Sequence, residues 1–192
     1  MVGARLYFVT GNVGKAAEFT AILRPVEVVT VPLQLEELQS PHLEVISAHK
    51  AEQAARMLGV TAVVDDSGLF VRALGGFPGP YTAYALETIG IQGIIDLLAG
   101  QPDRSAKFIS VVSYAEPGAR ALVFRGDVEG TITTAPRGGN GFGFDPIFEY
   151  QGRTFAELSP KDKNGVSHRF RALQVFREWY MANRAGTQSA PI

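Results

Sequence analysis

The order in which β-rich and helical segments follow one another constrains the fold of this 192-residue chain more than any other feature. In the first third, short runs of β-branched and aromatic residues are separated by helical stretches, which is the pattern of βα units. The second helical stretch should have Ser40 as its N-cap and Pro41 at its first helical position, and it should end at Leu58, before Gly59. The runs predicted to be strands are Arg5–Thr10, Val26–Val31 and Thr61–Val64.

The later part of the sequence has a different pattern, which is typical of an antiparallel meander. Three consecutive strands are predicted there, at Ala106–Ala115, Arg120–Arg125 and Asp127–Thr133. A final amphipathic helix should follow Ser167, with an apolar stripe made of Phe170, Leu173, Phe176 and Tyr180. Together, βα units and a meander predict an α/β fold with a mixed β-sheet.

Length and composition predict one folded domain, residues 1–184, followed by a polar tail, residues 185–192. The hydrophobic fraction of 46% and the charged fraction of 19% are ordinary for a folded protein. No apolar run approaches the roughly 20 residues that span a bilayer. The chain has no cysteine, which excludes disulfides, thiolate metal sites and a cysteine nucleophile. We therefore expect a cytoplasmic enzyme or binding protein that needs no membrane.

The charge distribution bears on the kind of partner. A net charge of -1 argues against a protein that coats nucleic acid. However, residues 153–184 carry seven Lys or Arg against three acidic residues. Such a local basic cluster suits a small polyanion, although a solvated helix face would have the same composition.

The turn after the first predicted strand reads Thr10-Gly11-Asn12-Val13-Gly14-Lys15. A strand that enters a glycine-bearing turn, followed by a helix with lysine in its first turn, directs N–H groups and a cation toward one point. That arrangement is suited to phosphate, although the spacing is not that of a P-loop. The alternative is an ordinary βα turn with a solvated lysine.

A second candidate is Asp65-Asp66-Ser67-Gly68, which the pattern places at the C-terminal end of a short strand. That edge of an α/β sheet is where ligands bind, but adjacent acids also occur in plain turns. In extended backbone the two carboxylates point to opposite faces, so only one would enter a given cleft. With Glu37, that aspartate could hold Mg²⁺.

Two further segments point to an aromatic slot lined by charge. In Gly138–Pro146, Phe142 and Phe144 have glycine neighbours. Rings in such a loop are poorly placed to form a core, and the bare backbone beside them would let a flat ligand stack on them. Asp145 could accept a hydrogen bond from a base edge, and the alternative is a loop anchored by its two rings. Lys163 and Ser167-His168-Arg169 place cations at a helix N-terminus, where an anion would relieve their unfavourable position.

Five motifs in one order resemble the inosine triphosphate pyrophosphatase family, also called XTP/dITP diphosphatases. The resemblance extends from Leu6 to about Tyr180. The motifs are Thr10–Lys15, Asp65–Leu69, Gly75–Tyr81, Gly141–Pro146 and Lys163–Arg169. It implies a long mixed sheet with flanking helices, two lobes around a central cleft, and a homodimer. It also implies Mg²⁺-dependent hydrolysis of deaminated purine triphosphates to the monophosphate and pyrophosphate.

The same resemblance implies roles for individual residues. The triphosphate would be bound by Thr10, Asn12, Lys15 and Lys50, and the predicted substrate site includes Gly11, Val13, Gly14 and Gly143 of the same motifs. Glu37 and Asp66 would hold the metal, and Asp66 would also be the catalytic base. The base pocket would contain Ser67, Phe142, Phe144, Asp145, Lys163, His168 and Arg169.

The sequence departs from the family pattern at two places. Phe144 stands where Tyr or Trp is frequent, and Thr82-Ala83-Tyr84 stands where some members carry a basic residue. Two alternatives stay open: a pyrophosphatase for modified pyrimidine triphosphates, and a nucleotide-binding module without turnover. The acidic pair argues against the second, because binding alone would not require two acids near phosphates.

Overall fold

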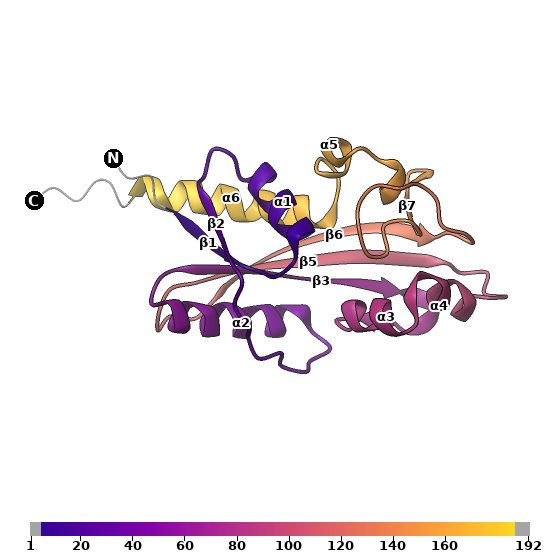
Figure 1. Ribbon diagram of the computed structural model, residues 1–192, viewed down its shortest axis with the longest axis horizontal. Coiled ribbons are helices and arrows are strands. Elements are labelled where there is room, and N and C mark those ends of the chain that lie inside the picture. The colour runs from indigo at the N-terminus through magenta and orange to yellow at the C-terminus, as the bar shows by residue number, and fades with distance from the viewer. Residues whose placement is uncertain (1–4, 187–192) are drawn as a thin grey trace, which may run out of the picture.

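A computed structural model describes residues 5–186, which form an eight-stranded mixed sheet flanked by helices (Figure 1). The strand order is β2-β1-β3-β5-β6-β7-β8, with β4 beside β3. The strands are β1 (Leu6–Val9), β2 (Val28–Val31), β3 (Ala62–Val71), β4 (Pro78–Gly79), β5 (Ser105–Ala115), β6 (Leu122–Ile132), β7 (Phe148–Tyr150) and β8 (Arg153–Thr154). The α-helices are α1 (Val13–Ile22), α2 (Leu43–Leu58), α3 (Thr82–Thr88), α4 (Gly90–Leu97), α5 (Pro160–Lys163) and α6 (His168–Gly186).

The sheet combines the two kinds of pairing that the sequence predicts. β1 pairs in parallel with β2 and β3, as expected for βα units. From β3 onward, β5, β6, β7 and β8 form an antiparallel meander. The predicted α/β fold with a mixed sheet is therefore confirmed.

Two local predictions about strands are wrong. Asp65 and Asp66 lie in the middle of β3 and not at the end of a short strand, because residues 62–71 pair continuously with β5. The stretches 120–125 and 127–133 form one long strand, β6, and not two. In both cases continuous pairing with β5 outweighs the local signals for a turn.

Capping residues mark the end of α2 and the start of α6, but the predicted cap at Ser40 is wrong, because the N-cap of α2 is His42, whose side chain makes no capping hydrogen bond. α2 begins at Leu43, two residues later than predicted, and ends at Leu58 before Gly59, whose φ of 67° is the left-handed conformation of a helix stop. The Oγ of Ser167 accepts a hydrogen bond from the Phe170 N–H at 3.2 Å, so Ser167 caps α6 as predicted. Residues 187–192 of the predicted tail lie outside the described residues.

Apolar cores lie at both ends of the sheet. At one end, α1 and α6 pack on the strands through Phe19, Leu173 and Phe176, while α2 packs against β3 and β5 (Figure 1). At the other end, α3 and α4 pack with Phe108 and Phe148. Between residues 5 and 186, no helix has the length and apolar character needed to cross a bilayer. The space between the two cores holds the candidate site.

Candidate active site

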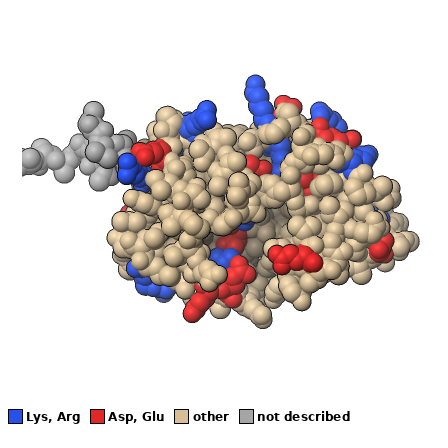
Figure 2. Space-filling view, in the orientation of Figure 1, with Lys and Arg blue, Asp and Glu red and all other residues tan. Residues whose placement is uncertain are grey.

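A cavity of about 590 Å³ opens between the two ends of the sheet. Figure 2 shows this face of the molecule hollowed near its middle, with acidic and basic side chains gathered at the hollow. The β1–α1 turn, the middle of β3, one residue of α2 and the start of α3 contribute to its wall. Its polar lining includes Thr10, Asn12, Lys15, Glu37, Lys50, Asp65, Asp66 and Ser67.

A smaller cavity of about 140 Å³ adjoins the first. The two share Asn12, Lys15, Ser67 and Ala83, so they are parts of one site. Rings and charged groups line the smaller one, namely Phe108, Phe142, Phe144, Asp145, Lys163, His168 and Arg169. The site therefore has a large polar part and a small part with aromatic walls, a combination typical of pockets for ligands with a flat ring and a charged tail.

Nearly all the residues predicted for the site line one of these cavities. The exceptions are two members of the turn after β1. Val13 lines neither cavity, and it is 84% exposed. Gly14 lies under the Phe142 ring, where an added Cβ would come within 2.8 Å of two ring carbons. A glycine is therefore needed at this position for Phe142 to approach α1.

The turn itself is built by local hydrogen bonds. Asn12 caps α1, because its side-chain oxygen accepts from the Lys15 N–H at 3.0 Å. The Asn12 N–H in turn donates to Thr10 Oγ1 at 3.1 Å. Lys15 is not a solvated lysine: its ammonium donates to the Asp65 carbonyl at 2.8 Å and lies 2.9 Å from the Asp65 carboxylate. The turn thus places one held cation at the boundary of the two cavities.

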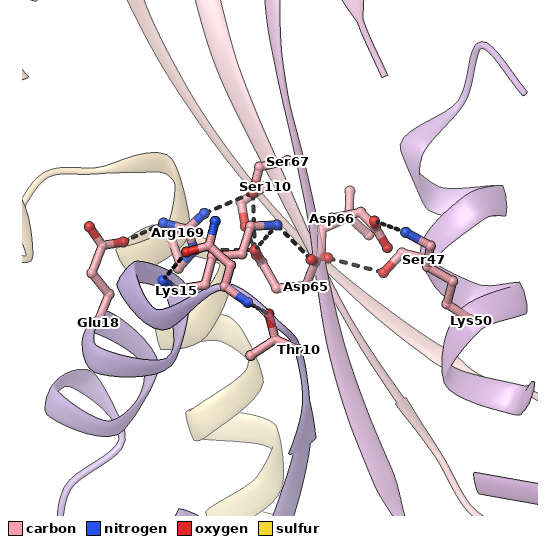
Figure 3. A network of polar contacts seen from close by, with 12 residues as sticks. Thr10, Lys15, Glu18, Ser47, Lys50, Asp65, Asp66, Ser67, Ser110 and Arg169 are labelled. Atoms are coloured by element: carbon pink, nitrogen blue, oxygen red, sulfur yellow. Dashed lines mark hydrogen bonds and ion pairs between the residues drawn. The ribbon is translucent and has the colours of Figure 1, made fainter. Parts of the chain in front are cut away.

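Asp65 is the centre of a buried network on the α1 and α6 side of β3 (Figure 3). Its carboxylate accepts from Arg169 Nε at 3.2 Å, from Ser67 Oγ at 3.1 Å and from Ser110 Oγ. Burial alone would raise the pKa of Asp65, but Arg169 and Lys15 hold it far below its usual value. Asp65 is therefore an ionised counterion for the site's cations.

Glu18, on α1, is a member of this network that the sequence reasoning missed. It accepts from Arg169 Nη1, and its other oxygen lies 2.9 Å from Lys163 Nζ. The sequence predicts an anion that offsets the unfavourable position of cations at the N-terminus of α6. Protein carboxylates take this part, because they neutralise the Arg169 charge. The available signal was spacing: Glu18 follows Lys15 by three residues, which puts both on one face of α1.

Lys163 connects the aromatic slot to a second carboxylate. Its ammonium lies 2.6 Å from Asp145 Oδ2 and 4.6 Å from the centroid of the Phe142 ring. Asp145 also accepts from the Phe142 N–H at 2.8 Å, which fixes the loop that carries the ring. Burial raises the pKa of Asp145, and the nearby Lys163 charge opposes that rise.

The two phenylalanines of the glycine-rich loop have different positions. Phe144 is only 1% exposed and belongs to the apolar core, so the expectation that it is poorly placed for a core is wrong. Phe142 is half-buried and presents its ring to the smaller cavity. His168 stacks on Phe108 with 4.6 Å between ring centroids. Burial lowers the pKa of His168 well below its usual value, so the ring is neutral.

On the α2 side of β3, two carboxylates converge on one lysine. Lys50 Nζ lies 2.5 Å from Glu37 Oε1 and 2.7 Å from Asp66 Oδ1. Although burial works against its charge, these carboxylates raise the pKa of Lys50. Asp66 Oδ2 is buried and has no hydrogen-bond partner within residues 5–186.

This pair fits a hard divalent cation. Two carboxylates from different segments share a polar cavity, and Asp66 Oδ2 still lacks a partner in the described part of the chain. Protein groups alone would not complete the coordination, since no cluster of three or more acidic or histidine ligands occurs within residues 5–186. The remaining ligands would have to come from water or from a bound anion, as is usual for Mg²⁺.

A charged cavity with a carboxylate pair, joined to an aromatic slot, defines the chain as a nucleotide-binding protein of the α/β class with groups suited to phosphate chemistry. The sequence model of the Ham1 family matches residues 6–179, and the chain belongs to that family.

Curated relatives and solved structures agree with this family. The chain is 50% identical to a dITP/XTP pyrophosphatase of Methanopyrus kandleri, over 95% of this chain and 99% of the relative. It is 42% identical to an inosine triphosphate pyrophosphatase of Fusarium vanettenii, over 94% and 98%. The structure of the Staphylococcus aureus Ham1 protein superposes with a TM-score of 0.83 at 33% identity, covering 94% of this chain and all of that one. The resemblance found in the sequence is confirmed.

Proposed function

We propose that this protein hydrolyses deaminated purine nucleoside triphosphates (ITP, dITP and XTP) to the monophosphate and pyrophosphate. The observation that carries the proposal is the joined pair of cavities, one polar with three carboxylates and two lysines, the other with aromatic walls and buried cations. The relatives named as dITP/XTP and inosine triphosphate pyrophosphatases support the same substrate class.

The larger cavity would receive the triphosphate. Its volume of about 590 Å³ falls in the range of small-molecule sites. The helix N-terminus at Asn12, with the ammonium groups of Lys15 and Lys50, would offset the phosphate charge that repels a nucleophile. When bound, Mg²⁺ held by Glu37 and Asp66 would neutralise further charge and stabilise pyrophosphate as the leaving group.

Asp66 is the proposed catalytic base. Asp66 Oδ2 has no partner within the described residues, so it is available to accept a proton from water that attacks the α-phosphorus. Asp65, by contrast, is saturated by Lys15, Arg169 and two serines and is not available for this role.

The smaller cavity would read the base. Phe142 would stack on the purine, and Lys163, His168 and Arg169, which line the same cavity, would supply donors to the edge of the base. Hypoxanthine and xanthine carry an acceptor at O6 and a donor at N1, whereas adenine has the reverse. A donor from His168 or Arg169 facing O6 would be left unpaired by ATP, and a mismatch of that kind can cost ~10⁴–10⁵ in rate.

The decisive experiment is a nucleotide panel with separate detection of pyrophosphate and phosphate, run with Mg²⁺ in ¹⁸O-labelled water. ITP, dITP or XTP should give pyrophosphate, with the label in the monophosphate only. ATP and GTP should react at least ~10²-fold less efficiently. Guanine shares O6 and N1–H with hypoxanthine, so the rejection of GTP would have to come from its 2-amino group. Label in free phosphate, or equal turnover of ITP and ATP, would refute the proposal. Faster turnover of modified dUTP or dTTP would favour a pyrimidine enzyme instead.

We also propose that the enzyme is a cytoplasmic homodimer, as the family resemblance implies. Light scattering on the purified chain measures the assembly, with twice the mass of 20.7 kDa as the expected result. Cell fractionation followed by the dITP assay measures the location.

A further inference from the structure

Lys50 stands between the two carboxylates that are suited to a divalent cation. It extends from α2, while Glu37 lies in the loop before that helix and Asp66 lies in the middle of β3. The three groups meet at one ammonium, 2.5 Å from Glu37 Oε1 and 2.7 Å from Asp66 Oδ1 (Figure 3 shows the Asp66 contact). The Lys50 and Asp66 side chains are largely buried, whereas the Glu37 side chain is 78% exposed.

The ammonium satisfies this pair only in part. It brings one positive charge to two carboxylates, and Asp66 Oδ2 keeps no partner within residues 5–186. A cation bound through Glu37 Oε1 and Asp66 Oδ1 would come as close to these oxygens as the ammonium does now. Two cations cannot share that place, because their repulsion at such distances in a partly buried site is large.

We propose that, in the free enzyme, the Lys50 ammonium occupies the position of the metal ion and must move away before a divalent cation binds. The inference rests on the proposed function, since triphosphate is the group in the same cavity that would attract the released ammonium. Metal binding to the nucleotide-free protein is then weak, and metal and nucleotide favour one another's binding. Lys50 is thus a positioning residue that makes metal binding conditional on substrate.

The primary test measures Mn²⁺ affinity of the nucleotide-free protein by titration calorimetry. Lys50→Met keeps an unbranched side chain of similar length and removes its charge. We expect Lys50→Met to bind Mn²⁺ at least about tenfold more tightly than wild type, within the usual range of site-to-site coupling. Lys50→Arg, which keeps the charge, should bind as weakly as wild type. Adding Asp66→Asn to Lys50→Met should abolish the gain and so locate the metal.

Lys107→Met is the matched control, because Lys107 lies on β5 outside both cavities of the site. It removes the same charge from the protein and should leave Mn²⁺ affinity unchanged. An equal gain in Lys107→Met would mean a general charge effect and would overturn the inference. So would unchanged affinity in Lys50→Met.

A second measurement uses only the wild-type protein, so it does not depend on the folding of a variant. Reductive methylation followed by mass spectrometry reports access to each lysine. Saturating Mn²⁺ should increase labelling of Lys50 severalfold and leave Lys15, which Asp65 holds, unchanged. Labelling of Lys50 that does not respond to Mn²⁺ would overturn the inference. If dITP is hydrolysed normally in that case, the proposed function stands without it; an enzyme inactive on every triphosphate refutes the function itself.

Discussion

Asp65 and Asp66 are neighbours in one strand, yet their side chains lie on opposite sides of β3 in different hydrogen-bonded environments (Figure 3). On the α1 and α6 side, Asp65 is fully buried and accepts from two cations and two serines. On the α2 side, Asp66 contacts Lys50, and its Oδ2 has no hydrogen-bond partner among residues 5–186. The difference separates a carboxylate that organises the site from one that can do chemistry in it.

The comparison predicts that Asp66→Asn removes activity without removing the fold. An amide is a far poorer proton acceptor, so kcat for dITP should fall by ~10²–10⁴, the usual contribution of a general base. The melting temperature should change little, since the ionic partner of Asp66 among the described residues is Lys50, which also keeps Glu37. A folded Asp65→Asn that loses more kcat than Asp66→Asn would contradict this assignment.

Asp65→Asn should instead reduce stability. It removes the carboxylate that pairs with Lys15 and leaves Arg169 with Glu18 as its remaining partner charge, and breaking a buried pair in this way typically costs ~3–5 kcal/mol. Urea denaturation at pH 7 measures the free energy of unfolding. The control is Asp103→Asn, at an exposed ion pair with Arg72, where the loss of stability should be much smaller because solvent screens the pair.

The pH dependence sharpens the same prediction. Because the pKa of Asp65 is lowered in the folded state, its stabilising effect is complete above the unfolded value of about 3.9. That effect is lost as the pH falls below about 4 toward the lower folded pKa. The unfolding free energy of the wild type should therefore fall more steeply below pH 4 than that of Asp65→Asn. Equal slopes would mean that Asp65 is not an ionised counterion.

The contrast between these carboxylates also shows what the sequence could and could not predict. Alternation in extended backbone correctly predicts that Asp65 and Asp66 face opposite sides. It does not identify their partners, because Arg169 is 104 residues from Asp65 along the chain. The βα turn at Asn12 was predictable because its hydrogen bonds are local. Glu18 was missed because its partner Arg169 is 151 residues away.

The glycine-rich loop offers a second pair of neighbours with different roles. Phe144→Ala should cost ~3–5 kcal/mol of stability, because Phe144 is buried in the core. Phe142→Ala should leave stability nearly unchanged and weaken dITP binding by ~1–3 kcal/mol, the value of a base–aromatic stack. Melting curves and KM measured on both variants separate the two effects. An unchanged KM in a folded Phe142→Ala protein would reassign that ring to packing.

The smallest expected effect concerns Glu18, which links α1 to the cations Lys163 and Arg169. Lys163 and Arg169 keep Asp145 and Asp65 as partners when Glu18 is neutralised, so Glu18→Gln should fold. Lys163 and Arg169 would then be positioned less firmly at the edge of the base. The preference of the enzyme for bases with an O6 acceptor over adenine should therefore fall. We expect the ratio of kcat/KM for ITP over ATP to fall about tenfold, the equivalent of one hydrogen bond to a charged group. Glu27→Gln, at an exposed ion pair with Arg5, is the control that should leave this ratio unchanged. If Glu18→Gln keeps the wild-type ratio, the contacts of Asp65 and Asp145 alone are sufficient to position the cations, and the selective part of the site does not extend to α1.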